Sequence, residues 1–225
     1  MLSVTDAIKR RISTRASLPT PLPRALVHEI LEVARFAPSG GNLQPWKVIV
    51  LAGAAAQEVK DLGLKIMGDD PSRSQEGDRP MYPASLWEPY RTRRFKVGED
   101  MYAKMGIARD NKPARYAHVA NNFRAFGAPV LLSFVIDRRM GHGQWAHLGM
   151  FMQSIALAAE ERGVQSCMQE AWMRIREDLH AHFKLGPQEM IYCGMALGHA
   201  DTSAPVNSLR SDRAPVEEFA TFRGF

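Results

Sequence analysis

Hydrophobic positions along this chain follow two spacings, one typical of helices and one typical of buried strands. Between residues 26 and 34 apolar side chains recur every three or four positions, which predicts a helix that begins after Pro23. A longer stripe of the same period runs from Leu148 to Ala159, and Gly163 marks its end. Both stripes describe helices that bury one face against a core.

Short uninterrupted apolar runs predict strands in that core. They occupy 46–51, 128–136 and 190–197, and the first two have the composition of central strands. Helices therefore alternate with few strands, without an internal repeat. We expect the remaining elements to be a first helix capped by Ser3 or Thr5 that runs into Arg11, a helix over 54–67, an extended segment over 164–168 and a helix over 170–183.

The stretch at about 68–115 differs in composition from the rest of the chain. A polar run at 69–74 reads as a loop, and prolines then alternate with aromatic residues. Because long loops of compact domains often cover binding sites, we expect an excursion over the functional site. Tyr82, Trp87 and Tyr102 are candidates for an apolar wall against a planar substrate. Simple packing of these rings onto the body of the protein is the equally weighted alternative.

The most informative run is 38–46, with the sequence PSGGNLQPW, at the start of an apolar strand. Its glycines let backbone N–H groups approach a flat or anionic ligand. Asn42 and Gln44 each offer a donor and an acceptor, as a ring with alternating N–H and C=O groups requires. The run therefore predicts a ligand-binding loop, although the same residues are common in ordinary helix-to-strand turns.

Two arginine clusters lie near opposite ends of the chain. Arg11 and Arg15 would share one face if their segment is helical, with the Ser13 hydroxyl between them in sequence. Arg210 and Arg213 supply two further guanidinium groups, whose forked donors match phosphate oxygens. Both clusters suit a phosphate, whereas either one alone could be a solvated surface or a set of ion pairs.

Taken in order along the chain, these blocks resemble the FMN-dependent nitroreductase family. The loop and its spacing from the N-terminal arginines carry most of the resemblance, and the stretch at 68–115 matches loosely. The matching residues are Arg11, Ser13 and Arg15; 38–46; Asn122 with 126–130; 149–153; Gly163 with 166–169; 193–198; and 213–215.

The resemblance implies an α+β fold, in which helices wrap a small, mostly antiparallel sheet and two chains intertwine as a homodimer. Both active sites would then lie at the dimer interface. It also implies FMN as the cofactor, bound by residues from both subunits. By position, Arg11, Ser13, Arg15, Arg210 and Arg213 would bind the phosphate and the pyrimidine edge from one chain, and Pro38, Ser39, Gly40, Asn42 and Gln44 would come from the other.

The resemblance assigns the chemistry to the flavin itself, so no side chain is expected to be a catalytic acid or base. The segment Cys167, Met168 and Gln169 corresponds to the loop beside flavin N5, where Met168 and Gln169 contact the cofactor. NAD(P)H would donate electrons and leave before a nitroaromatic or a similar planar acceptor enters, in a ping-pong cycle. The nitro group would be reduced to nitroso and then to hydroxylamine.

Composition agrees with a single domain over residues 1–225. The 225 residues are 45% hydrophobic, which is enough for one proper core. Cys167 and Cys193 lack CxxC spacing, so a reducing compartment fits and the cytoplasm is the expected location. The N-terminus has no apolar signal region, and the apolar runs are too short to span a bilayer, so we expect no membrane association.

The net positive charge is compatible with several kinds of partner. A net charge of +5 makes anionic ligands plausible, either phosphate-bearing cofactors or an anionic substrate such as an aromatic carboxylate. The basic, aromatic run at 90–96 could suit nucleic acid, but no nucleic-acid-binding motif accompanies it, so we expect no such partner. A colourless basic binding module stays as the non-enzymatic alternative.

Other motifs are weaker. The run GHGQWA at 141–146 matches a dinucleotide fingerprint, but the glycine does not follow a strand directly and parallel units are absent. The histidine pairs lack a carboxylate at metal-ligand spacing, so no metal site is expected. A flavoenzyme of the same fold with different chemistry, such as a reductive dehalogenase, an enone reductase or a flavin-fragmenting enzyme, is the main alternative.

Overall fold

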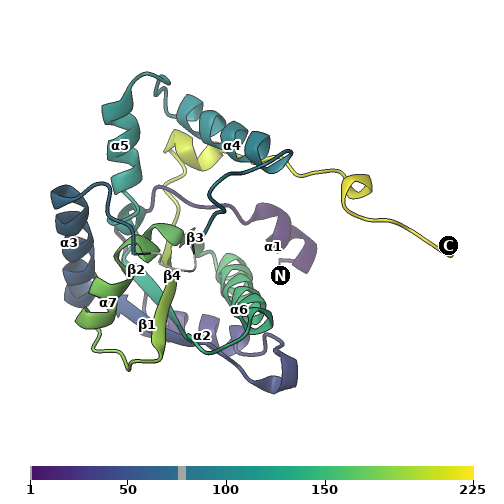
Figure 1. Cartoon of the computed structure of the whole chain (residues 1–225), viewed down its shortest axis with the longest axis horizontal. Coiled ribbons are helices and arrows are strands. Elements are labelled where there is room, and N and C mark those ends of the chain that lie inside the picture. Colours follow the sequence, from purple (N-terminus) through teal and green to yellow (C-terminus); the bar gives the residue numbers. More distant parts are fainter. Residues whose placement is uncertain (1, 76–79) are drawn as a thin grey trace.

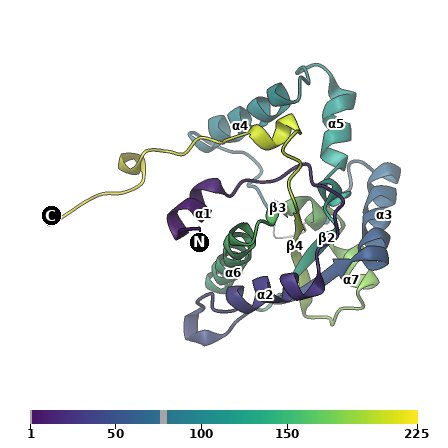
Figure 2. The same ribbon diagram turned by 180° about the vertical axis from the view of Figure 1, so that it is seen from behind.

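A four-stranded antiparallel sheet organises the protein, with strand order β1-β2-β4-β3. The computed structural model describes residues 2–75 and 80–225. Helices cover both faces of the sheet (Figures 1 and 2). The strands are β1 (Lys47–Ala52), β2 (Val130–Asp137), β3 (Gln165–Gln169) and β4 (Glu189–Gly198). The α-helices are α1 (Val4–Arg10), α2 (Arg24–Ala34), α3 (Gly53–Asp69), α4 (Tyr90–Lys104), α5 (Lys112–Ala120), α6 (His142–Glu161) and α7 (Arg176–His182).

Alternating side chains of β2 divide the core into two layers. Val130, Leu132 and Phe134 pack with α2 and α6 on one face, whereas Leu131 and Val135 pack with α3 and α7 on the other. This is the period-2 alternation of a strand that is covered on both sides. The α+β class with a small antiparallel sheet is therefore confirmed.

The predicted elements match the structure closely, including the first cap. Ser3 accepts a hydrogen bond from the Asp6 backbone N–H at 3.1 Å, as a helix N-cap does. The region predicted as one helix over 170–183 is a 3₁₀ helix, Glu170–Ile175, followed by α7. Within the described chain β1 lies at the sheet edge, so the expectation of a central position for 46–51 is wrong. Its apolar run is explained by packing of its two faces, not by a second neighbouring strand.

The stretch at 68–115 is not a continuous loop. It contains α4 and the beginning of α5, which lie together above the sheet in Figure 1. Its prolines bound the helix, since Pro89 immediately precedes α4. The last residues of the chain extend away from the body in both ribbon views. Across the described residues, no helix is long and apolar enough to cross a membrane.

Candidate functional site

The segment after α1 is extended, which changes how its arginines are arranged. The helix ends at Arg10, and Arg11 has backbone angles of −55° and 124°. The predicted helical pairing of Arg11 and Arg15 is therefore wrong. The backbone N–H of Thr14 donates to Ser166 O at 3.0 Å, which fixes the extended segment beside β3. Alternation along an extended chain still directs Arg11, Ser13 and Arg15 to one side.

One buried amide joins this N-terminal segment to the C-terminal arginines. The Arg15 backbone N–H donates to Asn207 Oδ1 at 2.8 Å. Asn207 Nδ2 in turn donates to Ala16 O and Asp201 O, each at 2.8 Å. Arg210 follows Asn207 by three residues and donates to its backbone oxygen at 3.0 Å. The two arginine clusters are thus brought together by a side chain that sequence reasoning did not single out.

The joined segments enclose a cavity of about 500 Å³, which we call the cationic cavity. None of its lining residues is acidic. Within 2–75 and 80–225, its four arginines form no salt bridge with a carboxylate. Uncompensated guanidinium groups around a cavity are suited to a phosphate. The lining residues are Ile8, Lys9, Arg11, Ile12, Ser13, Arg15, Val97, Leu209, Arg210, Ser211 and Arg213.

Glu160 of α6 lies outside the lining of the cationic cavity but interacts electrostatically with two of its arginines. Burial raises its pKa, while the charges of Arg10, Arg11 and Arg210 act in the opposite direction. A half-buried carboxyl beside cations can accept a hydroxyl group of a ligand, or donate to one when protonated. Glu160 is not among the site residues predicted from the sequence.

A second cavity, of about 510 Å³, adjoins the first and shares Arg15 with it. We call it the aromatic cavity. Because they share this arginine, the two cavities lie side by side, and we call the pair the groove, with a cationic end and an aromatic end of similar volume. The residues that line the aromatic cavity are Arg15, Met81, Tyr82, Arg94, Met101, Tyr102, His118, Val119, Asn122, Phe126, Cys167, Met168, Glu170, Ala171 and Arg174.

The strand β3 forms one wall of the aromatic cavity. Cys167 is buried, and burial raises the pKa of its thiol to about 11, so the thiol stays protonated at neutral pH. It serves as a wall residue and not as a nucleophile. Gln169 points into the core, where Nε2 donates to Asn122 O at 2.6 Å and Oε1 accepts from Trp172 at 3.3 Å. Met168 is the side chain of β3 with most access to the cavity.

The excursion supplies the opposite wall. Of the three aromatic residues predicted for a substrate wall, Tyr82 and Tyr102 line the aromatic cavity, whereas Trp87 lies outside its lining and packs edge-on against Tyr90. His118 of α5 is buried and packs against Tyr102 and Phe126, at centroid distances of 5.9 and 6.0 Å. Burial, and secondly the charge of Arg15, lowers the pKa of His118.

The loop at 38–44 lies apart from both cavities within one chain. Gly41, Asn42 and Gln44 adopt left-handed backbone angles, with φ of 61°, 53° and 49°. The Gly40 N–H donates to His147 of α6 at 3.3 Å. Most of the loop is exposed, and Asn42, Gly40 and Gln44 line neither cavity. Ser39 and Pro38 also line neither cavity, so a single chain does not unite all predicted cofactor residues.

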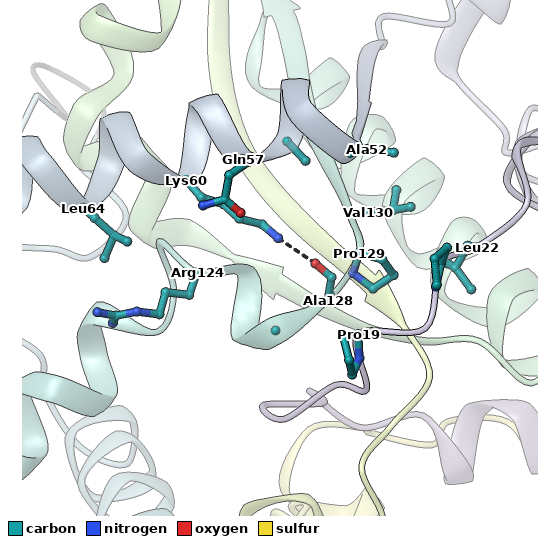
Figure 3. Close-up of a pocket in the computed structure, with 14 residues that line it drawn as sticks. Pro19, Leu22, Ala52, Gln57, Lys60, Leu64, Arg124, Ala128, Pro129 and Val130 are labelled. Atoms are coloured by element: carbon teal, nitrogen blue, oxygen red, sulfur yellow. Dashed lines mark hydrogen bonds between the residues drawn. The ribbon is translucent and has the colours of Figure 1, made fainter.

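A further cavity of about 540 Å³ lies at the end of β1 and contains none of the predicted site residues (Figure 3). Lys60 points into it and donates to Ala128 O at 2.8 Å, and burial lowers the pKa of this lysine. Prolines form much of its surface, and Arg124 lies at its margin (Figure 3). Its size alone does not make it the functional site, because its half-buried cation, Lys60, already has a backbone partner.

No metal centre is evident in the described part of the chain, where no three His, Cys, Asp or Glu side chains are grouped to hold an ion. Cys167 and Cys193 are both buried free thiols.

Comparison with known proteins identifies the family. The model of the family described as "Nitroreductase family" matches residues 8–199. The chain belongs to this family. Members with described activities match almost the whole of it. The chain is 38% identical to a 4-nitrobenzoate reductase of Pseudomonas putida, over 97% of this chain and 94% of the relative. It is 36% identical to a chloronitrobenzene nitroreductase of Comamonas testosteroni, over 97% and 96% respectively.

Solved structures of nitroreductase-family proteins share the fold over the entire length. An FMN- and NADPH-dependent nitroreductase from Sphigopyxis sp. strain HMH has a TM-score of 0.94 and 42% identity, and the match covers 100% of both chains. An FMN-dependent nitroreductase of Mycobacterium smegmatis, solved with NADPH, has a TM-score of 0.89 and 27% identity, covering 97% and 96%. The family assignment and the fold thus agree with each other.

Proposed function

We propose that this protein is an FMN-dependent nitroreductase that transfers electrons from NAD(P)H to nitroaromatic compounds. The observation that carries the proposal is the groove in which the cationic and aromatic cavities meet at Arg15. A mononucleotide with a flat ring needs a phosphate site and a ring site side by side, and the groove offers both. Relatives with this fold are named as FMN-dependent nitroreductases, which supports the same assignment.

The cationic cavity fits the phosphate of FMN. Arg11, Arg15, Arg210 and Arg213 would hold it, with the Ser13 hydroxyl as a further donor. Because these cations have no carboxylate partner among the described residues, a phosphate would supply the missing negative charge without displacing an ion pair. Glu160 interacts electrostatically with Arg11 and Arg210, and we propose that it helps to position these two cations.

The aromatic cavity fits the ring and, beyond it, a planar substrate. Bound FMN would supply the two-electron chemistry that no protein side chain provides. The backbone of Met168 and Gln169, at the end of β3, would lie beside the ring, and Arg15 would place a positive charge near its pyrimidine side. Tyr82 and Tyr102 would form the wall against which a second flat molecule rests.

A single substrate pocket accounts for the proposed order of events. The aromatic cavity is the site adjoining Arg15 in which both a nicotinamide and a nitroarene could contact the same ring. Two such molecules would compete for that space, so the donor leaves before the acceptor enters, in a ping-pong cycle. The nitro group would be reduced to nitroso and then to hydroxylamine, with protons taken from solvent because no acid side chain is required.

The remaining contacts are proposed to come from a second copy of the chain. Ser39, Gly40, Asn42 and Gln44 are exposed or half-buried and lie away from the cavities, so they would complete the site of a partner subunit in a homodimer, with Pro38 shaping the turn. Exposed aromatic side chains support such an interface. Phe36, Phe219 and Phe222 are 77%, 72% and 67% exposed, and the segment that carries the last two extends from the body (Figure 1).

We propose one domain over residues 1–225, with the stretch at 68–115 covering the groove. Its residues Tyr82, Arg94 and Tyr102 already line the aromatic cavity, which supports this role. We also propose a cytoplasmic location, because Cys167 and Cys193 are free thiols. The expected partners are small molecules and a second copy of the chain.

The absorbance spectrum of the purified protein tests the proposed function. We expect a two-banded flavin spectrum that NAD(P)H bleaches under nitrogen and that a nitroarene restores. A colourless protein that binds no added FMN would contradict the cofactor assignment. A flavin that NAD(P)H reduces but nitroarenes do not reoxidise would favour another chemistry of this fold, such as enone reduction or reductive dehalogenation.

A further inference from the structure

A stacked arginine distinguishes the aromatic cavity from a purely apolar substrate pocket. The guanidinium carbon of Arg94, on α4, lies 4.2 Å from the centroid of the Tyr82 ring. Both residues line the cavity. Stacking fixes the plane of a guanidinium group while leaving the N–H groups at its edge free to form bonds. Such an edge binds a planar carboxylate through two parallel hydrogen bonds.

Neighbouring arginines show why Arg94 is the available cation. Arg91, Arg93 and Arg115 are paired with Glu88, Glu218 and Glu99 at 2.7, 2.6 and 2.6 Å. Arg94 forms no ion pair with any carboxylate in the described ranges. The neighbouring arginines are thus paired with carboxylates from several segments, and Arg94 leaves a positive charge at the cavity.

The other charged groups of the aromatic cavity already have partners. Arg174 donates to the backbone oxygens of Arg73 and Pro71 at 3.0 and 2.6 Å. Glu170 accepts the hydroxyl of Tyr82 at 3.0 Å. The carboxylate of Glu170 therefore holds the ring on which Arg94 stacks. With Arg15 at the junction of the cavities, positive charges outnumber the one acidic group of the lining.

We propose that Arg94 binds an anionic substituent of the nitroaromatic substrate, so that the enzyme prefers nitroaromatic carboxylates to neutral nitroarenes. This inference rests on the proposed function, and it decides a point on which the relatives differ, since some are named for nitrobenzoate and others for uncharged nitrobenzenes. Arg94 is a specificity residue here and not a catalytic one, because its charge would act on a substituent away from the nitro group.

Kinetics with a matched pair of substrates test the proposal. We would measure kcat and KM for 4-nitrobenzoate and for nitrobenzene at fixed NADPH, with wild type, Arg94→Gln, Arg94→Lys and the control Arg91→Gln. Arg91 lies on the same helix, is also an arginine, and does not line the aromatic cavity.

Arg94→Gln should lower kcat/KM for 4-nitrobenzoate by roughly tenfold, mainly through KM, since an exposed charge-assisted hydrogen bond is lost. The kcat/KM for nitrobenzene should change less than about twofold. Arg94→Lys should retain part of the preference for 4-nitrobenzoate because it keeps the charge. Higher ionic strength should weaken the preference of the wild type for 4-nitrobenzoate over nitrobenzene, and it should leave the substrate preference of Arg94→Gln unchanged. Arg91→Gln should behave as wild type with both substrates.

An equal loss of kcat/KM for both substrates in Arg94→Gln would overturn the proposal and make Arg94 a structural residue. A rise in the KM for NADPH without a change for 4-nitrobenzoate would also overturn it, since the cation would then serve the phosphates of the donor. Benzoate binding gives a readout independent of turnover. If the protein reduces neither nitroarene, the proposed function fails, yet weaker benzoate binding by Arg94→Gln, with benzamide unaffected, would still support an anion site. Unchanged benzoate binding would refute it.

Discussion

The backbone N–H of Arg15 and the side-chain oxygen of Asn207 are joined by a 2.8 Å hydrogen bond between residues that lie 192 positions apart in the chain. Asn207 is 8% exposed, and its amide nitrogen is bonded to two backbone oxygens. One side chain thus satisfies three backbone groups that would otherwise be buried without partners. It also sets the distance between the two arginine segments that line the cationic cavity.

Replacing Asn207 by alanine should therefore reduce both stability and cofactor affinity. Loss of three buried hydrogen bonds is expected to lower the free energy of unfolding by about 2–4 kcal/mol. FMN should bind more weakly because Arg210 and Arg213 are no longer fixed opposite Arg15. Urea denaturation and fluorescence titration with FMN measure the two effects. The control is Ser208→Ala, since Ser208 is exposed and bonds only to Pro205 O within the described chain. Unchanged FMN binding by Asn207→Ala would show that the two segments hold their positions without it.

Removing the side chain of Arg15 should lower cofactor retention and activity together. Arg15→Ala is expected to release FMN more readily and to lower turnover, because Arg15 belongs to both cavities. The measurements are flavin content after dialysis and kcat with saturating added FMN. Arg24→Ala, at the exposed start of α2, should leave both unchanged. Normal flavin content with full turnover in Arg15→Ala would place the cofactor elsewhere.

Complementation tests whether each site uses two chains. Arg15→Ala and Asn42→Ala alter residues that lie apart in one chain and would meet only across a dimer interface. If the subunits exchange, a mixed dimer would contain one site with both changes and one site with neither. Co-refolded variants should then recover activity, up to about one quarter of the wild-type value when subunits assort at random. Activity that stays at the average of the separate variants would show that all contacts come from one chain.

His118 predicts a defined dependence of stability on pH. Its ordinary pKa is 6.5, and burial and Arg15 lower it in the folded state. Between the ordinary pKa and the lower pKa of the folded state, the unfolded chain binds the proton more readily than the folded protein. Acidification through this window therefore destabilises the folded protein. Each unit by which the pKa is lowered corresponds to about 1.4 kcal/mol.

His118→Leu should lose this contribution. We expect the melting temperature of the wild type to fall more than that of the variant between pH 8 and pH 5. The comparison at pH 8 isolates packing effects, because the imidazole is neutral in both states there. An equal fall for both proteins would show that His118 is protonated at no cost in the folded state.

Much of the fold could be read from local patterns. The stripe at 26–34 predicted α2, and the apolar runs at 128–136 and 190–197 predicted β2 and β4. The cap at Ser3 followed from a side-chain oxygen preceding a helix. Such signals depend on residues within a few positions of one another, so a single sequence carries them.

Two predictions that depended on the position of a distant segment were wrong. The strand at 46–51 has the composition of a central strand, but its edge position depends on which strands pair, and its own residues do not specify that. Arg11 and Arg15 were placed on one face through a helix, whereas contact with Ser166 on β3 holds the segment extended. Both arginines nevertheless line the cationic cavity.

The sequence by itself determined the positions of the main helices and strands, because side-chain periodicity is a local property. Its motifs also carried the resemblance that implied the family, the fold class and the residues that bind the proposed cofactor. Only the tertiary structure decided that Asn207 joins the two arginine segments, that the two cavities meet at Arg15, and that Arg94 stands unpaired beside Tyr82 among the described residues. Long-range packing and charge pairing settle these points, since each requires side chains far apart in sequence to be within a few ångströms of one another.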